Sequence, residues 1–352
     1  MSTGDSSALA RQLADLADAD RFSGSVLVTR GNETVFECAA GWADRAYGIP
    51  LTPASRFGLA SMSKMFTAAA VVSCVRDGLL APHDRVSSIV PEQRRPQTMP
   101  DEVTVHHLLT HTSGIGDYAE EDEDVTSYVE DYAALWADRP SYRMERPLDF
   151  LPMYTAAPPV MAPGTQFHYS NAGYVLLGQV LEEVTGQPVI EAITERVLVP
   201  ARMASSGFLR LDEAHANVAT GYLPRAQDEP WRSNVFSIPV VGGGDGGALA
   251  AARDIDRFLR CLTSGDLLGE RCTTLMRSPH VQISDSFSMG YGLFVKPDGS
   301  LGHGGGDPGI ETMTRHWPDR DVTLVVLCNL EEGLEPVWDL LLDAGLDQGR
   351  TP

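Results

Sequence analysis

Segments typical of β-strands occur near both ends of the chain, and the middle has a mainly helical pattern. GSVLVTR (24–30) alternates in polarity, and a second run follows the turn at Gly31-Asn32, which predicts a β-hairpin after a short N-terminal helix. Near the C-terminus stand three short β-type runs and then an amphipathic helix: MGYGLFV, GIETMTRHW, DVTLVVLCNL and EPVWDLLLDAGL. This order predicts one antiparallel sheet built from both ends of the chain and flanked by terminal helices.

The pattern between the strands predicts an inserted helical region. A length of 352 residues and an apolar fraction of 43% are enough for one large domain or two packed units. We therefore expect an α+β fold in which 1–60 and 236–352 form the sheet region and 61–235 the mainly helical region. The acidic stretch 119–131 is most simply a solvated face or a lid. A cleft between the two regions is the natural place for a functional site.

The charge of the chain excludes several classes of partner. A net charge of −21 argues against a protein that binds nucleic acid or an anionic membrane surface, because both need clustered cations. No stretch approaches the ~20 apolar residues of a membrane span, and the first residues lack the pattern of a signal peptide, so we expect a cytoplasmic protein. The five cysteines are scattered without metal-ligand spacing, which favours neither disulfides nor a zinc site.

The strongest chemical signal is the segment 57–80, FGLASMSKMFTAAAVVSCVRDGLL, which predicts a helix that begins near Ser61 and ends at Gly78. Ser61 and Lys64 are three residues apart and therefore share one face of that helix. Apolar neighbours and the positive end of the helix dipole should lower the pKa of Lys64, so that a neutral amine can take the proton of the Ser61 hydroxyl. The N-terminus of the helix also offers N–H groups to a developing oxyanion. The alternative is an ordinary helix start capped by serine.

The use of lysine supports the chemical interpretation. Of the 27 Lys and Arg residues only two are lysines, Lys64 and Lys296. Arginine cannot release its proton at any accessible pH, whereas lysine can. A chain that otherwise avoids lysine has kept one where arginine would not serve.

A second signal lies in PGTQFHYSNAGYVLLGQVLEEVTG (163–186), where Tyr169-Ser170-Asn171 precedes an amphipathic helix and Gly186 follows it. A loop at a helix N-terminus can aim a phenol and a carboxamide into a cleft. Near a cationic Lys64 the pKa of Tyr169 could fall far enough for the phenol to act as base or acid, and Asn171 could bond both Lys64 and a substrate carbonyl. The alternative is a core tyrosine beside a helix cap.

The third signal is GSLGHGGGDPGIETMTRHW (299–317). The glycines at 304–306, Gly305 and Gly306 among them, let another backbone approach the strand edge, so that the Gly306 N–H could be a second oxyanion donor. His303 would point a donor into the same space. The alternative is a flexible turn with a surface histidine.

Taken in order, these three segments resemble the active-site motifs of the serine β-lactamase / penicillin-binding-protein superfamily. LLTHTSGI (108–115), PGTQFHYSN (163–171) and GYGLFV (290–295) are similar to its class C and esterase branch. The resemblance implies a β-lactamase/transpeptidase-like fold with catalytic Ser61, Lys64 and Tyr169.

Two departures narrow this resemblance. His303 stands where penicillin-recognising enzymes carry a lysine that helps to hold a substrate carboxylate. A histidine at this position is similar to the pattern of the family's esterases, D-amino-acid peptidases and transesterases. Many relatives are exported, whereas we find no pattern of an export signal in this sequence. The histidine argues against efficient β-lactam hydrolysis, and the second point favours a cytoplasmic metabolic or biosynthetic role over cell-wall remodelling.

Other motifs are set aside. GGGDGGA (242–248) matches a dinucleotide fingerprint, but its helix runs into a loop rather than a second strand, so we expect no cofactor. The segment His303 to Gly306 matches the HGGG motif of lipases, yet the GxSxG elbow of that fold is absent from the sequence. His106, His107 and His111 lack a suitably spaced carboxylate, so we expect no metal site.

Three functions remain open. The first is a serine hydrolase that cleaves a small ester or amide through a Ser61 acyl-enzyme. The second is an acyltransferase, a transesterase or amide synthase that passes the acyl group to an alcohol or amine. The third is a non-catalytic binding protein on the same scaffold. The stretches 119–131 and 128–154 are expected to shape the acyl pocket.

Overall fold

The computed structural model describes residues 3–125, 127–226 and 229–346. Ten α-helices are found in these residues: α1 (Thr3–Asp18), α2 (Lys64–Arg76), α3 (Val86–Ile89), α4 (Val105–Leu109), α5 (Pro147–Tyr154), α6 (Asn171–Thr185), α7 (Val189–Ile193), α8 (Ala252–Thr263), α9 (Glu270–Arg277) and α10 (Leu334–Asp343). The strands at the N-terminal side are β1 (Gly24–Arg30), β2 (Glu33–Ala40), β3 (Trp42–Asp44), β4 (Ile49–Pro50) and β5 (Phe57–Gly58). Those that follow the helical region are β6 (Leu249–Ala250), β7 (Val281–Gln282), β8 (Ser288–Met289), β9 (Phe294–Val295), β10 (Leu301–Gly302), β11 (Gly304–Asp307), β12 (Ile310–Trp317) and β13 (Val322–Cys328).

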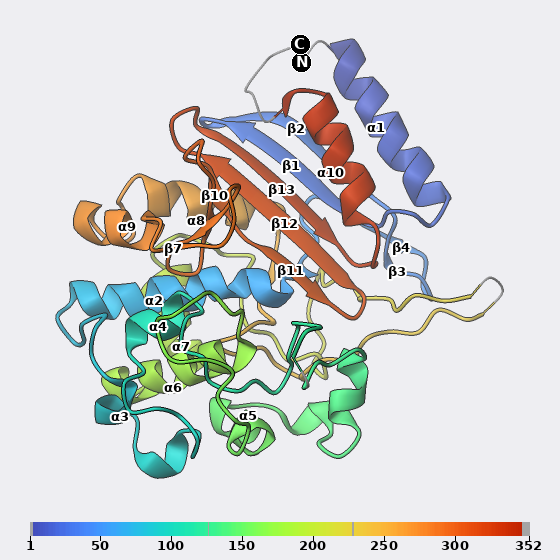
Figure 1. Cartoon of the computed structure of the whole chain (residues 1–352). Coiled ribbons are helices and arrows are strands. Elements are labelled where there is room, and N and C mark those ends of the chain that lie inside the picture. The colour runs from blue at the N-terminus through green and yellow to red at the C-terminus, as the bar shows by residue number, and fades with distance from the viewer. Residues whose placement is uncertain (1–2, 126, 227–228, 347–352) are drawn as a thin grey trace.

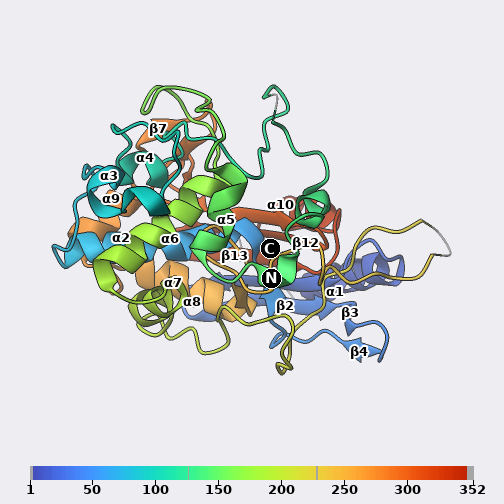
Figure 2. The same ribbon diagram turned by 90° about the horizontal axis from the view of Figure 1, so that it is seen from below.

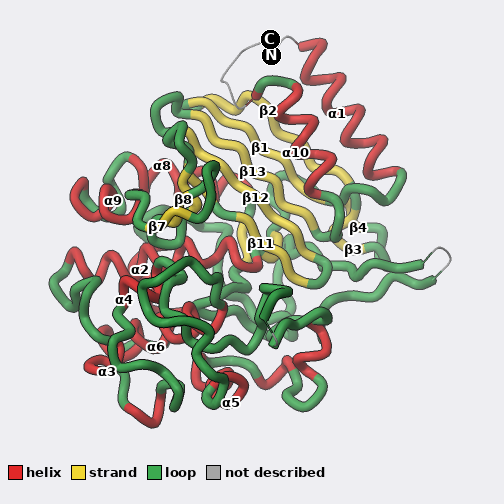
Figure 3. The backbone as a smooth tube through the Cα atoms, in the orientation of Figure 1, coloured by secondary structure: helices red, strands yellow, loops and turns green. Residues whose placement is uncertain are grey.

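One large antiparallel sheet joins the two ends of the chain (Figure 3). Its strand order is β2-β1-β13-β12-β10-β9-β8-β7, and β11 pairs with β12 beyond β10. N-terminal strand β1 lies beside C-terminal strand β13, with Val26 opposite Val326. The architecture confirms the predicted α+β fold, with an antiparallel sheet, terminal helices and a helical insertion.

The two terminal helices cover one face of this sheet (Figure 1). Leu13 of α1 and Leu341 of α10 are fully buried and belong to one apolar cluster with Val26 and Val326. The spacing of the apolar residues in both helices is that of a single buried stripe, as the sequence predicts.

The opposite face of the sheet carries α8 and, beyond it, the helical region (Figure 2). Helix α2 is buried on all sides over Lys64 to Cys74, and Phe66 meets Phe258 of α8 edge to face at 4.9 Å. A single apolar cluster runs from Leu27 and Val325 on the sheet into α2 and α6. Because this cluster spans both regions, it does not mark where one ends, and the predicted boundaries of the helical region at 60 and 235 stay a prediction.

Two segments differ from the sequence expectation. The run 289–295 is not one strand, because Gly292 adopts a φ of +64° and turns the chain between β8 and β9. A Cβ at Gly292 would lie 3.0 Å from the Lys64 carbonyl oxygen, so this turn lies directly against α2. The helix predicted to begin near Ser61 starts as a 3₁₀ turn, η1 (Ala60–Ser63), before α2. Within the described residues, no helix has the length and apolar character needed to cross a membrane.

Candidate active site

Ser61 lies in η1, one turn before Lys64 begins α2. Ala60, the residue before it, has a φ of +47°, a left-handed conformation that is uncommon outside glycine. This turn is held by the N–H of Gly247, which donates to the Ala60 carbonyl at 3.3 Å. The result places the Ser61 hydroxyl 2.8 Å from Nζ of Lys64.

Lys64 is fully buried and contacts three oxygen atoms. Besides Ser61, Nζ lies 2.7 Å from Oδ1 of Asn171 and 2.6 Å from the carbonyl oxygen of Asp245. The last two atoms can only accept hydrogen bonds. Nζ donates to all three oxygens, which matches the three hydrogens of an ammonium. After loss of one proton, the two obligate acceptors would keep the remaining hydrogens and the lone pair would turn to the Ser61 hydroxyl.

The charge state of Lys64 depends on two opposing effects. Burial lowers the pKa of its ammonium, and the carboxylates of Asp245 and Glu121 partly oppose that effect. The net direction is downward, as the sequence predicts. Loss of the proton is thereby brought closer to neutral pH.

Asn171 and Tyr169 reach the same place from the start of α6. The Ser170 side chain caps this helix by accepting the Gly173 N–H at 3.0 Å. The Asn171 carboxamide, bonded to Lys64 through its oxygen, donates through Nδ2 to Glu121 at 2.8 Å. The Ser61 side chain is close enough to lower the pKa of the Tyr169 phenol, and both residues line one cleft. The predicted meeting of hydroxyl, amine and phenol is present.

The pKa of Tyr169 moves against the sequence expectation. Burial raises it well above the ordinary value, with Glu121 adding to the rise and the Ser61 side chain opposing it. Lys64 Nζ lies 5.0 Å from the ring centroid, which does not reverse the effect of burial. Tyr169 is therefore a neutral phenol at rest, able to donate a proton rather than to serve as a resting base.

His111 is a positioning residue that sequence reasoning missed. Its ring stacks on Tyr169 at 4.3 Å, and Nδ1 accepts the Ser170 N–H at 3.0 Å. This bond places the proton on Nε2, and burial lowers the pKa of the imidazole well below its usual range. The sequence feature that contains His111 is LLTHTSGI, which supports the family resemblance but does not by itself indicate a role for this histidine. Within the described part of the chain, no group of three or more His, Cys, Asp or Glu could hold a metal ion.

Strand β11 brings the third segment against η1. A Cβ at Gly305 would lie 2.9 Å from the Ser61 nitrogen and 2.3 Å from the Leu59 carbonyl oxygen, so only glycine allows this approach. The backbone N–H of Thr314 donates a hydrogen bond to the backbone carbonyl oxygen of His303 at 3.1 Å. With the β11–β12 register, the alternation of an antiparallel pair turns the Gly306 N–H away from β12, toward the open edge. Gly306 is thus oriented as a second oxyanion donor would need to be.

His303 lies at the break between β10 and β11 and is buried rather than on the surface. Its Nδ1 contacts the Gly304 carbonyl oxygen, an acceptor only, so Nδ1 carries the proton and Nε2 is an acceptor. Burial lowers the pKa of His303 to about 3, so the ring is neutral. Its Nε2 thus differs from the donor that we expected there.

The glycine-rich loop 242–248 has a role that the sequence did not reveal. Its Asp245 carbonyl accepts from Lys64, and its Gly244 carbonyl accepts from Thr67 at 2.6 Å. Gly244 approaches Tyr174 so closely that a Cβ would lie 2.4 Å from its carbonyl oxygen. The glycines therefore serve close packing against α2 and α6, and Asp245 belongs to the site.

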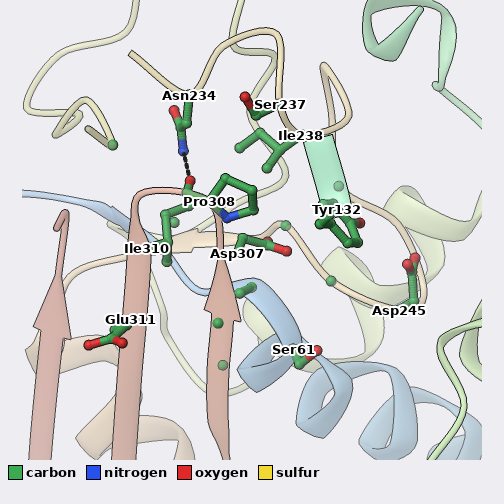
Figure 4. A pocket seen from close by; sticks show the side chains of 18 of the residues that line it. Ser61, Tyr132, Asn234, Ser237, Ile238, Asp245, Asp307, Pro308, Ile310 and Glu311 are labelled. Carbon is green, nitrogen blue, oxygen red and sulfur yellow. Dashed lines mark hydrogen bonds between the residues drawn. The ribbon is translucent and has the colours of Figure 1, made fainter. Parts of the chain in front are cut away.

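A cleft of about 1180 Å³ opens above Ser61 and is lined by the predicted residues Tyr169, Asn171, His303, Gly305 and Gly306. Figure 4 shows Ser61 on its floor, with Asp245 and Asp307 near it. The two stretches expected to shape the pocket contribute to its lining: Glu121, Val129, Glu130, Asp131, Tyr132, Ala133 and Phe150. The side chains of Ser61 and Tyr169 and the backbone of Gly305 and Gly306 thus face one space.

The sequence model of the beta-lactamase family matches residues 8–344, so the chain belongs to that family, and it is a hydrolase of the family. Penicillin-binding protein 4* of Bacillus subtilis (strain 168) is 28% identical over 336 residues, 91% of this chain and 71% of that protein. Esterase EstB of Burkholderia gladioli is 37% identical over 194 residues, 54% of this chain and 48% of that protein. The crystal structure of a penicillin-binding protein from Bacillus halodurans is 35% identical with a TM-score of 0.87, covering 94% of this chain and 99% of that one.

Proposed function

We propose that this chain is a serine hydrolase that cleaves a small ester or amide through a covalent acyl-enzyme on Ser61. The observation that carries the proposal is the set of contacts of Lys64. Nζ of Lys64 donates to the Ser61 hydroxyl at 2.8 Å and to two obligate acceptors, so an amine that has lost one proton would keep its hydrogens on those acceptors and turn its lone pair to Ser61. The similarity to an esterase over about half of the chain supports the choice of reaction.

The reaction runs in two steps. In the first, the Ser61 oxygen bonds to the carbonyl carbon while its proton passes to Lys64, and the N–H groups of Ser61 and Gly306 stabilise the oxyanion. The bond to the leaving group then breaks as that group takes a proton from Tyr169, which Lys64 reprotonates. In the second, a water oxygen attacks the acyl carbon while its proton passes through Tyr169 to Lys64. The bond between the Ser61 oxygen and the acyl carbon then breaks as that oxygen takes the proton from Lys64, which frees the acid.

Fluorophosphonate labelling followed by peptide mass spectrometry tests the nucleophile. We expect one modified serine, Ser61, and no labelling of Ser61→Ala. Ser63→Ala is the matched control, because Ser63 lies in the same turn but its hydroxyl accepts the Ala248 N–H instead of facing the cleft. Labelling that persists in Ser61→Ala, or that disappears in Ser63→Ala alone, contradicts the assignment.

The fate of the acyl group is tested by product analysis. With p-nitrophenyl butyrate as donor, we expect butyric acid as the main product in water. Added alcohols or amines are the controls, since an acyltransferase would convert most of the donor to the butyrate ester or amide at millimolar nucleophile. Such a result would replace hydrolysis with transfer while leaving the role of Ser61 intact.

A further inference from the structure

The cleft above Ser61 is strongly acidic. Its described lining includes seven Asp and Glu residues against two arginines. Three of the acidic groups, Asp245, Glu121 and Asp307, act electrostatically on Lys64. The Asp245 carboxylate accepts a hydrogen bond from the Tyr118 hydroxyl at 2.5 Å, and the Glu121 carboxylate accepts one from the Asn171 amide. Asp307 differs from both, because its carboxylate has no hydrogen-bond partner among the described residues.

Asp307 is placed where a substrate would meet it. It ends β11, directly after the candidate oxyanion donor Gly306, and its side chain points into the cleft toward Tyr132 (Figure 4). Two apolar residues, Ile238 and Ile310, form the neighbouring wall. Asp307 is partly buried beside these apolar walls and has no hydrogen-bond donor among the described residues, so its carboxylate is incompletely hydrated and a cationic ligand would be a favourable partner.

The electrostatic surroundings of Asp307 agree with this interpretation. Burial raises the pKa of Asp307 to about 7, with Asp245 and Glu121 adding to the rise and Lys64 opposing it. Among the described residues, the positive group that lowers the pKa of this carboxylate is Lys64, which in the proposed function gives up its charge during the reaction. A substrate cation would be a partner that does not depend on the catalytic cycle.

A second observation comes from the other end of β11. His303 is 3% exposed, lines the cleft, and its acceptor Nε2 has no partner among the described residues. A buried acceptor without a donor is rare and needs an explanation. The cleft therefore presents a buried unsatisfied acceptor at one end of the strand and a partly buried carboxylate at the other, and a ligand that carries N–H donors suits both.

We propose that Asp307 is a specificity-determining residue that binds an ammonium group carried by the acyl donor within a few bonds of the scissile carbonyl, as in an amino-acid amide or ester. This proposal rests on the proposed function, because it takes the carbonyl to lie between Ser61 and Gly306. Asp307 is one residue further along the strand, about 3.4 Å in rise, which is close enough for its side chain to meet an α- or β-amino group. A substrate carboxylate at this position would be repelled.

The test compares each amine-bearing substrate with its neutral N-acetyl form. For D- and L-alanine p-nitroanilide and β-alanine p-nitroanilide, we expect at least one free amine to be cleaved with a higher kcat/KM than its N-acetyl form. Asp307→Asn should reduce that preference by about 10- to 100-fold, the usual range for a hydrogen bond to a charged group. Glu130→Gln removes one charge at the rim of the same cleft and is the matched control, with an expected change in preference below about threefold.

Three outcomes would overturn the proposal: no preference for a free amine in the wild type, an unchanged preference in Asp307→Asn, or an equal loss in Glu130→Gln, which would indicate the general field of the cleft. Calorimetric binding of alaninamide and N-acetylalaninamide to Ser61→Ala separates this proposal from the proposed function. If the wild type cleaves p-nitrophenyl butyrate through Ser61 but the amine is not preferred, only the Asp307 proposal fails. If Ser61 is not labelled and yet alaninamide binds in an Asp307-dependent way, only the proposed function fails.

Discussion

The two faces of the large sheet are built on different principles. The face under α1 and α10 is an apolar layer in which Leu13 and Leu341 meet Val26 and Val326. The face toward the helical region leads to a set of buried polar groups around Lys64, which pairs with residues 107 and 181 positions away, Asn171 and Asp245. The first face gains free energy from burial, whereas the second spends some of it to hold ionisable groups out of water.

This difference indicates which property, stability or activity, a substitution on each face should change. An apolar layer tolerates substitutions that keep volume and pattern, and its loss lowers stability without touching chemistry. A buried polar site depends on the identity and protonation state of single groups. Substitutions on the two faces should therefore separate stability from activity.

Replacing the catalytic amine gives the largest expected effect. Lys64→Arg keeps the positive charge but removes a group that can lose its proton, so we expect turnover of p-nitrophenyl butyrate to fall by about 10²- to 10⁴-fold. Lys296→Arg changes the other lysine, near Phe287 at 5.0 Å, and should stay within about twofold. Near-normal turnover in Lys64→Arg would remove the general-base role and, with it, the contrast between the two faces.

Opening a cavity in the apolar layer should have the opposite signature. Leu13→Ala removes a fully buried side chain of α1 and should lower the free energy of unfolding by about 3 kcal/mol, while kcat of the folded protein is unchanged. Gln12→Ala, exposed on the same helix, is the control. Urea unfolding and steady-state kinetics measure the two quantities. A large loss of kcat in folded Leu13→Ala would show that the two faces are coupled.

The fold could be predicted from the sequence because strand alternation and helical periodicity are local signals. The same is true of Ser170 and Gly186, which cap the two ends of α6 as their residue types suggest. The contacts of Asp245 and His111 could not be predicted in this way, since they depend on a glycine loop and a helix end folding back onto distant segments. The upward shift in the pKa of Tyr169 also escaped prediction, because burial is a tertiary property and it outweighed the nearby amine.

The cost of the polar face can be measured at Asp307. Its pKa of about 7 in the folded protein lies above the unfolded value of about 3.9, so the folded state holds more protons between these values. The free energy of unfolding therefore falls as pH rises from about 4 to about 7. Asp307→Asn should be more stable than the wild type by on the order of 2 kcal/mol at pH 8, and the difference should vanish below about pH 4.

Thermal or urea unfolding of both proteins across this pH range measures the effect. Glu130→Gln is again the control, because it removes an equal charge from an exposed position. A less stable Asp307→Asn at pH 8 would mean that the carboxylate has a stabilising partner in the folded protein. The Asp307 carboxylate would then not be an unpaired charge in the ligand-free cleft.

The smallest expected effect lies at the end of α6 that is remote from the site. Gly186 follows this helix with a φ of +69°, and a Cβ there would meet no atom within 4 Å, so Gly186→Ala adds backbone strain without a clash. We expect the free energy of unfolding to fall by about 1 kcal/mol. Asn171 is the first residue of the same helix, about 20 Å away along its axis, so kcat should not change. A reduced kcat in Gly186→Ala would show that the position of Asn171 depends on the whole helix rather than on the Ser170 cap and the contact with Lys64.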